Sequence, residues 1–380
     1  MQKVKILHCA DLHLGSEMMT LPKKSKERKG ELLRTFRKIT DLCREEAVEI
    51  LLIAGDLFEG SNVDSETVQS VKSYLGALSC PVFISPGNHD YISLDSPYLE
   101  DGWPENVKIF KGAMERVVLE DKNVAVYGAG FTGTYQRKSM LQFGEVNSSL
   151  LNILCIHGDV VSPGQKSDYH AMTLEDFRKS GMDYVALGHI HKREDIGRAG
   201  DTFYAYPGCP EGRGFDELGS KGVYLGELYK GRHTLHYVEV CQRQYVRLAL
   251  DITGLVRELE VEHKIRETLL TCYGKDFDRH IYQISLTGTR KEEEALPVKT
   301  IENTLSESIY HLELSDERVV ERDYEILREE VSLRGLYVRN LLSLLEEARE
   351  KEDEVLLAAY GKALEYGMTS FEGQVNIIED

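Results

Sequence analysis

Five short apolar runs, each followed by a side chain that can bind a metal ion, restrict the possible fold of this chain more than any other feature. They cover residues 4–10, 50–55, 82–84, 151–156 and 183–188. Their aliphatic and β-branched content is typical of buried strands. Apolar residues at helical spacing, from Leu32 to Cys43 and again over 65–78, predict crossover helices between the first three runs. The pattern indicates βαβ units and therefore an α/β fold.

The polar residues that follow these runs are the candidate site. They are Asp11, His13, Asp56, Asn88, His89, Asp90, His157, His189 and His191. Ligands in α/β proteins collect beyond the carboxyl ends of strands, so these residues are expected to converge. Each residue alone is more simply explained as a turn or as a hydrogen-bonded histidine. Their recurrence at the end of every run favours a metal site instead.

This set of ligands predicts a two-metal centre. Imidazoles, carboxylates and one amide suit Mn²⁺, Fe²⁺ or Zn²⁺ better than Mg²⁺ or Ca²⁺, which prefer oxygen alone. The set is adequate for two ions only if one carboxylate is shared, and Asp56 is the expected bridge. His89 is left as a protonated imidazole that can donate a proton to a leaving oxygen. Asp90 is expected either to orient His89 or to cap the turn.

Composition sets limits on the partners and the location of the chain. The formal net charge of the 380 residues is -18, which argues against a nucleic-acid partner. From Ile301 onward, however, 8 Lys and Arg face 20 Asp and Glu, so much of the excess lies in the tail and a local basic cleft is not excluded. No apolar stretch approaches the ~18 residues of a membrane span, and no signal-like segment opens the sequence, so the cytoplasm is expected.

Cysteine usage indicates reduced thiols. The seven cysteines are dispersed and form no C-x-x-C pair. Such usage is typical of a reducing compartment and gives no support to a structural zinc site.

The chain is expected to contain three parts. The first, residues 1–242, ends after a hairpin predicted over 222–240. A small α+β module follows over 243–326, with helices at 255–271 and 298–310 and a polar strand at 319–326. Residues 327–380 are expected to form acidic helices with apolar stripes, which either pack on their own domain or bind a partner helix.

The order and text of the motifs resemble the calcineurin-like metallophosphoesterases. The matching blocks are Asp11-Leu12-His13, Gly55-Asp56, Gly87-Asn88-His89-Asp90, His157-Gly158-Asp159 and Gly188-His189-Ile190-His191. Within that superfamily the chain resembles the SbcD-type DNA exonuclease subunits, especially their YhaO-like branch. The resemblance implies a metallophosphoesterase β-sandwich flanked by helices, then a small α+β capping domain and a C-terminal helical segment.

The resemblance also implies roles for individual residues. One metal would be held by Asp11, His13, Asp56 and His191, and the other by Asp56, Asn88, His157 and His189, with His89 as the acid. The family degrades DNA ends with Mn²⁺ and binds a coiled-coil ABC-type ATPase through C-terminal helices.

The leading functional hypothesis is a Mn²⁺-dependent phosphodiesterase that hydrolyses DNA, as the nuclease subunit of a DNA repair complex. A phosphodiesterase or phosphatase for nucleotides is the alternative, and a non-catalytic scaffold or regulatory subunit is the second alternative. No Walker A segment is present, so ATP-driven movement would require a partner. The sequence leaves open whether the chain forms a homodimer.

Overall fold

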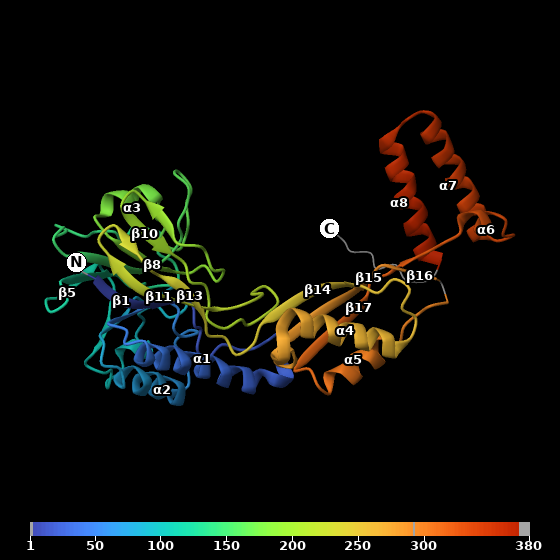
Figure 1. Ribbon diagram of the computed structural model, residues 1–380. Coiled ribbons are helices and arrows are strands. Elements are labelled where there is room, and N and C mark those ends of the chain that lie inside the picture. Colours follow the sequence, from blue (N-terminus) through green and yellow to red (C-terminus); the bar gives the residue numbers. More distant parts are fainter. Residues whose placement is uncertain (1–2, 292, 372–380) are drawn as a thin grey trace. The chain divides into compact units, whose positions relative to one another are not determined.

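The computed structural model describes residues 3–291 and 293–371 (Figure 1). Two compact units are formed by residues 1–247 with 276–283 and 309–311, and by most of the rest of the chain. The first unit is built on two β-sheets, whose strands supply the candidate site.

The first sheet joins four parallel strands to an antiparallel hairpin. Its strands in spatial order are β12 (Arg232–His233), β11 (Gly222–Tyr229), β1 (Lys3–Cys9), β2 (Ile50–Ile53), β3 (Val82–Ile84) and β4 (Val107–Ile109), with β13 (His236–Glu239) also paired to β11. Helices α1 (Ser25–Glu45) and α2 (Ser65–Gly76) cover one face. Leu32, Phe36 and Ile39 of α1 pack there against Leu51 and Ile53 of β2. The predicted crossover helices are therefore confirmed.

The second sheet is also mainly parallel. Its strands in spatial order are β5 (Glu115–Leu119), β6 (Val124–Gly128), β7 (Leu151–His157), β8 (Tyr184–Gly188), β10 (Thr202–Ala205) and β9 (Gly197–Ala199). Helix α3 (Leu174–Ser180) packs on its outer side through Phe177. Strands β5, β9 and β10 were not predicted, because they are short and several of their residues are polar.

The two sheets face each other across a buried apolar layer. Ile6 and Leu52 of the first sheet and Val126 and Ile153 of the second lie in one cluster of fully buried side chains. This is the β-sandwich flanked by helices that the family resemblance implied. The five ligand-bearing strands are divided between the sheets, with β1, β2 and β3 in one and β7 and β8 in the other.

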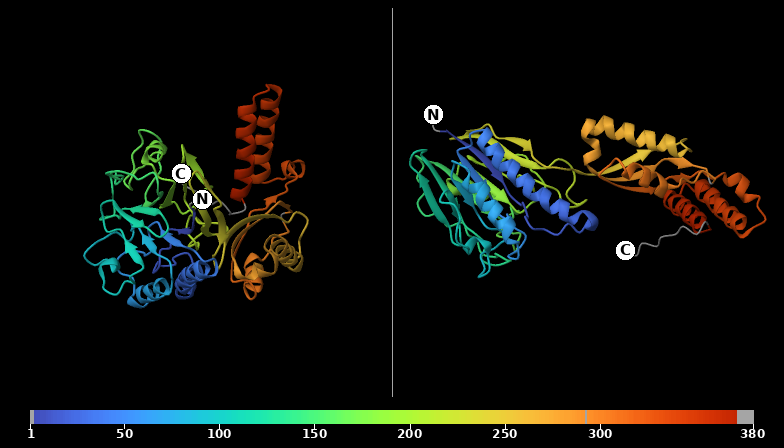
Figure 2. Two further views of the ribbon diagram at one scale, coloured as in Figure 1. Left: turned by 60° about the vertical axis from the view of Figure 1, so that its left-hand side comes forward. Right: turned by 90° about the horizontal axis from the view of Figure 1, so that it is seen from below.

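The chain beyond residue 244 forms a small α+β module. Strands β14 (Tyr245–Asp251), β15 (Ile281–Thr287) and β17 (His311–Asp316) make a sheet, and α4 (Glu258–Tyr273) and α5 (Val298–Ser306) lie beside it (Figures 1 and 2). A 3-10 helix, η3 (Gly274–Arg279), links α4 to β15. Shorter 3-10 helices lie at η1 (Pro22–Lys24) and η2 (Pro97–Leu99).

The strand predicted over 319–326 is largely wrong. Only β18 (Val319–Val320) forms, paired with β16 (Thr289–Arg290). Asp323 then begins helix α6 (Tyr324–Arg328), because its carboxylate accepts hydrogen bonds from the backbone of Glu325 and Ile326. The predicted helix that starts at Val298 ends at Ser306, and the strand β17 that follows was not predicted.

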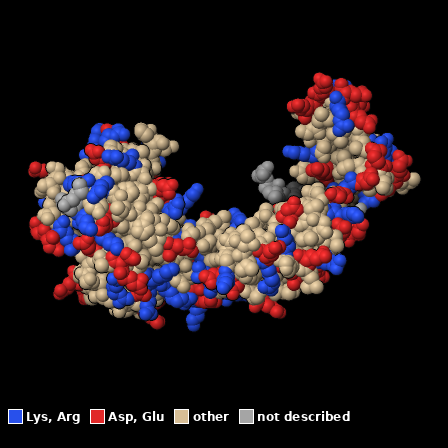
Figure 3. Space-filling model, viewed as in Figure 1, with Lys and Arg blue, Asp and Glu red and all other residues tan. Residues whose placement is uncertain are grey.

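Helices α7 (Leu333–Glu350) and α8 (Glu354–Phe371) pack on each other as a hairpin. Val338, Leu364 and Met368 form their buried seam. Figure 3 shows Asp and Glu side chains concentrated over this hairpin, in agreement with the acidic tail of the sequence. Among the described residues, no helix has the length and apolar character needed to span a membrane.

Candidate metal centre

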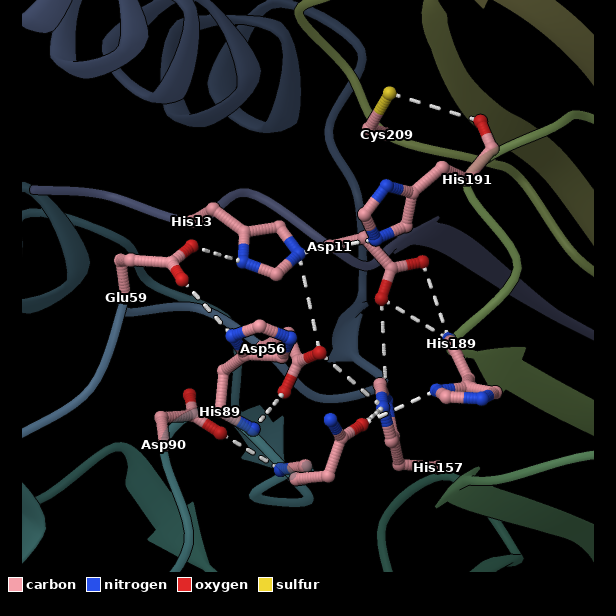
Figure 4. A network of polar contacts seen from close by, with 12 residues as sticks. Asp11, His13, Asp56, Glu59, His89, Asp90, His157, His189, His191 and Cys209 are labelled. Carbon is pink, nitrogen blue, oxygen red and sulfur yellow. Dashed lines mark hydrogen bonds and ion pairs between the residues drawn. The ribbon is translucent and has the colours of Figure 1, made fainter. Parts of the chain in front are cut away.

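The five predicted strand ends meet at one place (Figure 4). The Nε2 atom of His157 lies 2.9 Å from Oδ1 of Asn88 and 3.3 Å from Oδ2 of Asp56. His189 reaches the same Asn88 oxygen through Nδ1, at 3.1 Å. All seven predicted ligands, from both sheets, are therefore brought together.

On the side of Asp11, ligand atoms of Asp11, His13 and His191 lie within 4.8 Å of one another. Nδ1 of His13 faces a Glu59 carboxylate oxygen at 2.7 Å, and Nδ1 of His191 faces Glu217 at 2.6 Å. Each imidazole can therefore donate from Nδ1 to its carboxylate and keep its lone pair on Nε2. The two Nε2 atoms lie only 3.1 Å apart. With a lone pair on each, the two atoms point into the same small volume, so these residues fit a metal ion placed between them.

The second group of ligands has the same character. Nδ1 of His157 donates to the carbonyl of Ala54 at 2.9 Å, and Nε2 of His189 lies 3.2 Å from Asp159. The remaining nitrogens both face the Asn88 oxygen, which is also an acceptor. Burial lowers the pKa of His157, but the carboxylates of Asp56 and Asp11 outweigh it and raise the pKa to about 9. The negative charge of Asp56 and Asp11 that raises this pKa is the charge that a divalent cation would balance when bound.

Four of the ligand candidates have strained backbone. The φ angles of Asp11, His13, Asp56 and His189 are 55°, 47°, 48° and 113°, a region that side chains other than glycine adopt rarely. Backbone hydrogen bonds hold two of them, from Asp11 to the Gly55 carbonyl at 3.0 Å and from His13 to the Asp56 carbonyl at 2.9 Å. Strain of this kind concentrates at functional sites, where the surrounding structure enforces it.

Gly87 lets the loop after β3 approach the bridge candidate. A Cβ atom at Gly87 would lie 2.2 Å from Oδ1 of Asp56 and 2.8 Å from Nε2 of His157. With glycine there, the backbone N–H of His89 can donate to the same Asp56 oxygen at 2.9 Å. The turn therefore fixes Asp56, Asn88 and His89 as one unit.

The ring of His89 is oriented by Glu59. Its Nδ1 lies 2.9 Å from the second carboxylate oxygen of Glu59, and its side chain is 42% exposed. This hydrogen bond raises the pKa of His89, with the charges of Asp56 and Glu59 adding to it against the effect of burial. His89 therefore has one nitrogen held and the other available.

Asp90 holds the loop backbone. Its carboxylate accepts hydrogen bonds from the N–H of Leu57 at 2.8 Å, of Gly87 at 2.7 Å and of Phe58 at 3.2 Å, and from the Tyr98 hydroxyl. Burial and the nearby charge of Asp56 raise its pKa to about 6. Of the two roles expected for Asp90, the structure places it in the turn-holding position, and Glu59 has the partner position at His89.

Four residues behind the ligands were not predicted from the sequence, namely Glu59, Asp159, Arg213 and Glu217. Arg213 joins two of them, donating to Glu59 at 3.1 Å and to Glu217 at 3.0 Å. Its guanidinium also lies 3.1 Å from Nδ1 of His191. Weak signals were present, since Glu59 follows Asp56 by three residues and Arg213 lies in a Gly- and Pro-rich loop. Hydrophobic periodicity carries no information about such contacts.

Comparison with known proteins gives results that agree with this geometry. A sequence model described as calcineurin-like phosphoesterase matches residues 4–193. The chain is 30% identical to an uncharacterized metallophosphoesterase, YhaO, from Bacillus subtilis, over 65% of this chain and 63% of that protein. It is 24% identical to the DNA double-strand break repair protein Mre11 of Saccharolobus solfataricus, over 77% of each chain.

Among solved structures, a dimetal phosphatase from Danio rerio is similar with a TM-score of 0.42 and 13% identity, over 63% of this chain and 98% of that one. The alignment with YhaO spans less than two thirds of that relative's length. The match to the family model runs from β1 through His191 and so takes in every ligand-bearing strand end of both sheets. This chain belongs to the calcineurin-like phosphoesterase family.

Proposed function

We propose that this chain is a Mn²⁺-dependent phosphodiesterase that hydrolyses DNA, acting as an exonuclease in a repair complex. The observation that carries the proposal is the convergence of acceptor atoms from seven ligand candidates beside His89. Support for DNA as the substrate comes from the relatives named as DNA double-strand break repair proteins. The α+β module beyond residue 244 supports it further, since hydrolysis of a small phosphate ester would not require a second module.

In this proposal Asp11, His13, Asp56 and His191 hold one ion, and Asp56, Asn88, His157 and His189 hold the other. Bound divalent ions would supply charge neutralisation at the phosphoryl group and activation of the attacking water. Mn²⁺ fits the mixed nitrogen and oxygen donors, and Fe²⁺ or Zn²⁺ remain alternatives. Glu59, Asp159 and Glu217 each face one nitrogen of His13, His189 and His191, so that each imidazole would present its other nitrogen to an ion.

His89 is the proposed proton donor. Because Nδ1 is held by Glu59, Nε2 is the atom that can meet the leaving oxygen. Because its pKa is raised, the His89 ring stays protonated up to a higher pH than an ordinary histidine. Asp90 contributes by holding the turn from which Asn88 and His89 project.

Partner binding is proposed for the α7–α8 hairpin, with a coiled-coil ABC-type ATPase as the partner. The hairpin keeps large apolar side chains in solvent, among them Leu333 at 72% and Val355 at 78% exposed. A coiled coil could bury these side chains. Removing residues 327–380 should abolish copurification of the ATPase and leave the metal content unchanged. Retained copurification would contradict this assignment.

Three further expectations belong to this proposal. The division at 242/243 and at 326/327 separates the nuclease, capping and partner-binding parts. The protein acts in the cytoplasm. The proposal is also compatible with a homodimer that forms through the α7–α8 hairpin or through another surface.

The decisive experiment is a nuclease assay with Mn²⁺ on defined single- and double-stranded DNA ends, comparing the wild type with His89→Ala. Metal analysis of the purified wild type should give about two ions per chain. The wild type should shorten DNA and His89→Ala should not. Hydrolysis of simple phosphate esters or nucleotides without cleavage of DNA would favour the small-substrate alternative. Failure to bind metal at all would favour the scaffold.

A further inference from the structure

Two loops beside the second metal group are joined into one surface. Loop 130–142 follows β6, and loop 158–172 follows β7. The N–H of Gln136 donates to the Asp168 carbonyl at 2.7 Å, and the N–H of His170 donates to the Gln136 carbonyl at 2.6 Å. These bonds place Tyr135 beside Tyr169.

The joined loops carry a row of rings that leads from solvent to the metal centre. The ring of Tyr169 lies 4.8 Å from the His189 ring, centroid to centroid, and the ring of Tyr135 lies 5.9 Å from that of Tyr169. The guanidinium of Arg137 lies 5.5 Å from the Tyr135 ring. We name Arg137, Tyr135 and Tyr169 the aromatic strip. Its outer members are open to solvent, with Tyr135 56% exposed and the Arg137 side chain 69% exposed.

Buried contacts attach the strip rigidly to the ligand candidates. His170 is fully buried, donates through Nδ1 to the His157 carbonyl at 3.2 Å, and accepts the N–H of Met140 at Nε2, at 3.0 Å. Nearer the turn, the N–H of Phe131 donates to the Pro86 carbonyl at 3.0 Å. The strip therefore holds a fixed position relative to His157 and to the turn of Asn88 and His89.

Three basic residues, Arg137, Lys138 and Lys166, lie on the two joined loops. Arg137 pairs with Asp168 at 2.6 Å, and within the residues that the structure describes neither Lys138 nor Lys166 has an ion pair. Gln136 and Lys138 also line a cavity of about 270 Å³ between the end of the first sheet and this loop, where Gly112, Gly130 and Met140 contribute the walls. The two joined loops thus carry basic side chains in addition to the exposed ring of Tyr135.

We propose that the aromatic strip binds unpaired nucleotides at the end of a DNA strand, with a base stacked on Tyr135 and the neighbouring phosphate at Arg137 and Lys138. An exposed ring can stack on a base only where that base has left the duplex, so the strip favours single-stranded DNA over blunt duplex. The inference rests on the proposed function, because it names the part of the DNA substrate that this site recognises.

The test measures binding without catalysis. Fluorescence anisotropy of a labelled single-stranded oligonucleotide, in EDTA, is compared for wild type, Tyr135→Ala and Tyr135→Phe. Stacking predicts about a 10-fold loss of affinity for Tyr135→Ala and a value within about twofold of wild type for Tyr135→Phe. An oligonucleotide with abasic sites should bind wild type and Tyr135→Ala equally. Arg137→Gln should weaken binding and reduce its dependence on salt.

Tyr229→Ala is the matched control. The Arg232 guanidinium lies 4.2 Å from the Tyr229 ring, so the same pairing is present there. Tyr229 pairs with Lys3, at the end of β1 opposite to Asp11. Its removal should leave the affinity for DNA within about twofold of wild type. An equal loss from Tyr229→Ala would overturn the assignment to the strip.

The other outcomes separate this inference from the proposed function. Unchanged binding by Tyr135→Ala, with DNA cleavage by the wild type in Mn²⁺, would overturn the strip alone. A loss for Tyr135→Phe as large as that for Tyr135→Ala, at an unchanged melting temperature, would overturn stacking. A wild type that neither binds nor cleaves DNA would overturn the proposed function.

Discussion

Replacing Glu59 by Gln should separate the orientation of His89 from the presence of the metals. One carboxylate oxygen of Glu59 accepts from His89 at 2.9 Å, and the other accepts from His13 at 2.7 Å and from Arg213 at 3.1 Å. An amide of the same shape offers one acceptor and one donor. Whichever way it turns, at least one of these N–H groups then faces an N–H₂ group.

The magnitude follows from the charge and exposure of the pair. A hydrogen bond to a charged group contributes about 1.5–3 kcal/mol. Glu59 is 30% exposed and His89 is 42% exposed, so solvent screening reduces this to about 1–2 kcal/mol. We therefore expect kcat of Glu59→Gln to fall about 5- to 30-fold at saturating Mn²⁺. Saturation matters because the His13 tautomer, and with it metal affinity, also depends on Glu59.

The pH dependence gives a second measurement. Glu59 raises the pKa of His89, so the protonated donor persists above the usual range and activity is lost as the pH rises through the raised value. In Glu59→Gln this alkaline limb should move to lower pH. NMR titration of the His89 ring in metal-free protein should show the same direction of change.

The control is Glu175→Gln on α3. Its carboxylate binds Arg178 at 2.6 Å and Lys179 at 3.2 Å, but on the exposed surface. This variant should keep kcat within about twofold. If Glu59→Gln kept both the wild-type kcat and the wild-type alkaline limb, Glu59 would not be the group that orients His89.

Three further predictions concern the turn after β3 and the buried core. Asn88→Ala should weaken metal binding, whereas His89→Ala should keep about two ions and lose about 10²- to 10⁴-fold in turnover, measured by metal analysis and kcat; equal emptying by both would refute the assigned roles. Gly87→Ala should lower metal content and cost about 1–3 kcal/mol of stability, because its Cβ would lie 2.2 Å from Asp56 Oδ1. Gly361→Ala, with open space around its Cβ, should cause neither loss, and equal melting temperatures of the two variants would count against the close approach. Burial lowers the pKa of His8 to about 3, so below pH 7 the unfolded chain binds a proton at His8 that the native state does not. Between pH 7 and pH 5 the unfolding free energy of the wild type, measured in urea, should therefore fall by about 2 kcal/mol more than that of His8→Gln. Equal losses would contradict a neutral His8.

The ligand-bearing strands were predictable because burial on both faces makes them continuous apolar runs. Each run ends where the chain emerges at the edge of its sheet, so Asp11, Asp56, Asn88 and His157 stand out by position alone. The division of the runs between two sheets was carried only by the family resemblance. Nothing in the local pattern of β7 states that it pairs with β6 and β8 and not with β3.

The groups behind the ligands were not predictable for a different reason. Glu217 and Arg213 reach His191 from a loop whose path depends on tertiary contacts, including the buried carboxylate of Glu211 bound to Arg28 at 3.0 Å. Their sequence context indicates only an irregular, glycine-rich segment. The failed strand at 319–326 has a local cause, because the N-terminal cap at Asp323 overrides a weak strand preference.

At the left-handed backbone positions Asp11, His13, Asp56 and His189, the residue that favours stability differs from the residue that activity requires. Glycine at any of these positions would relieve strain and at the same time remove a ligand. A library of variants selected only for resistance to heat, in the absence of metal, should therefore accumulate glycine at these four sites. Proteins of this fold that have lost the activity would be expected to acquire glycine at the same positions. Glycines at these positions after β1, β2 and β8 would therefore identify such an inactive protein from its sequence.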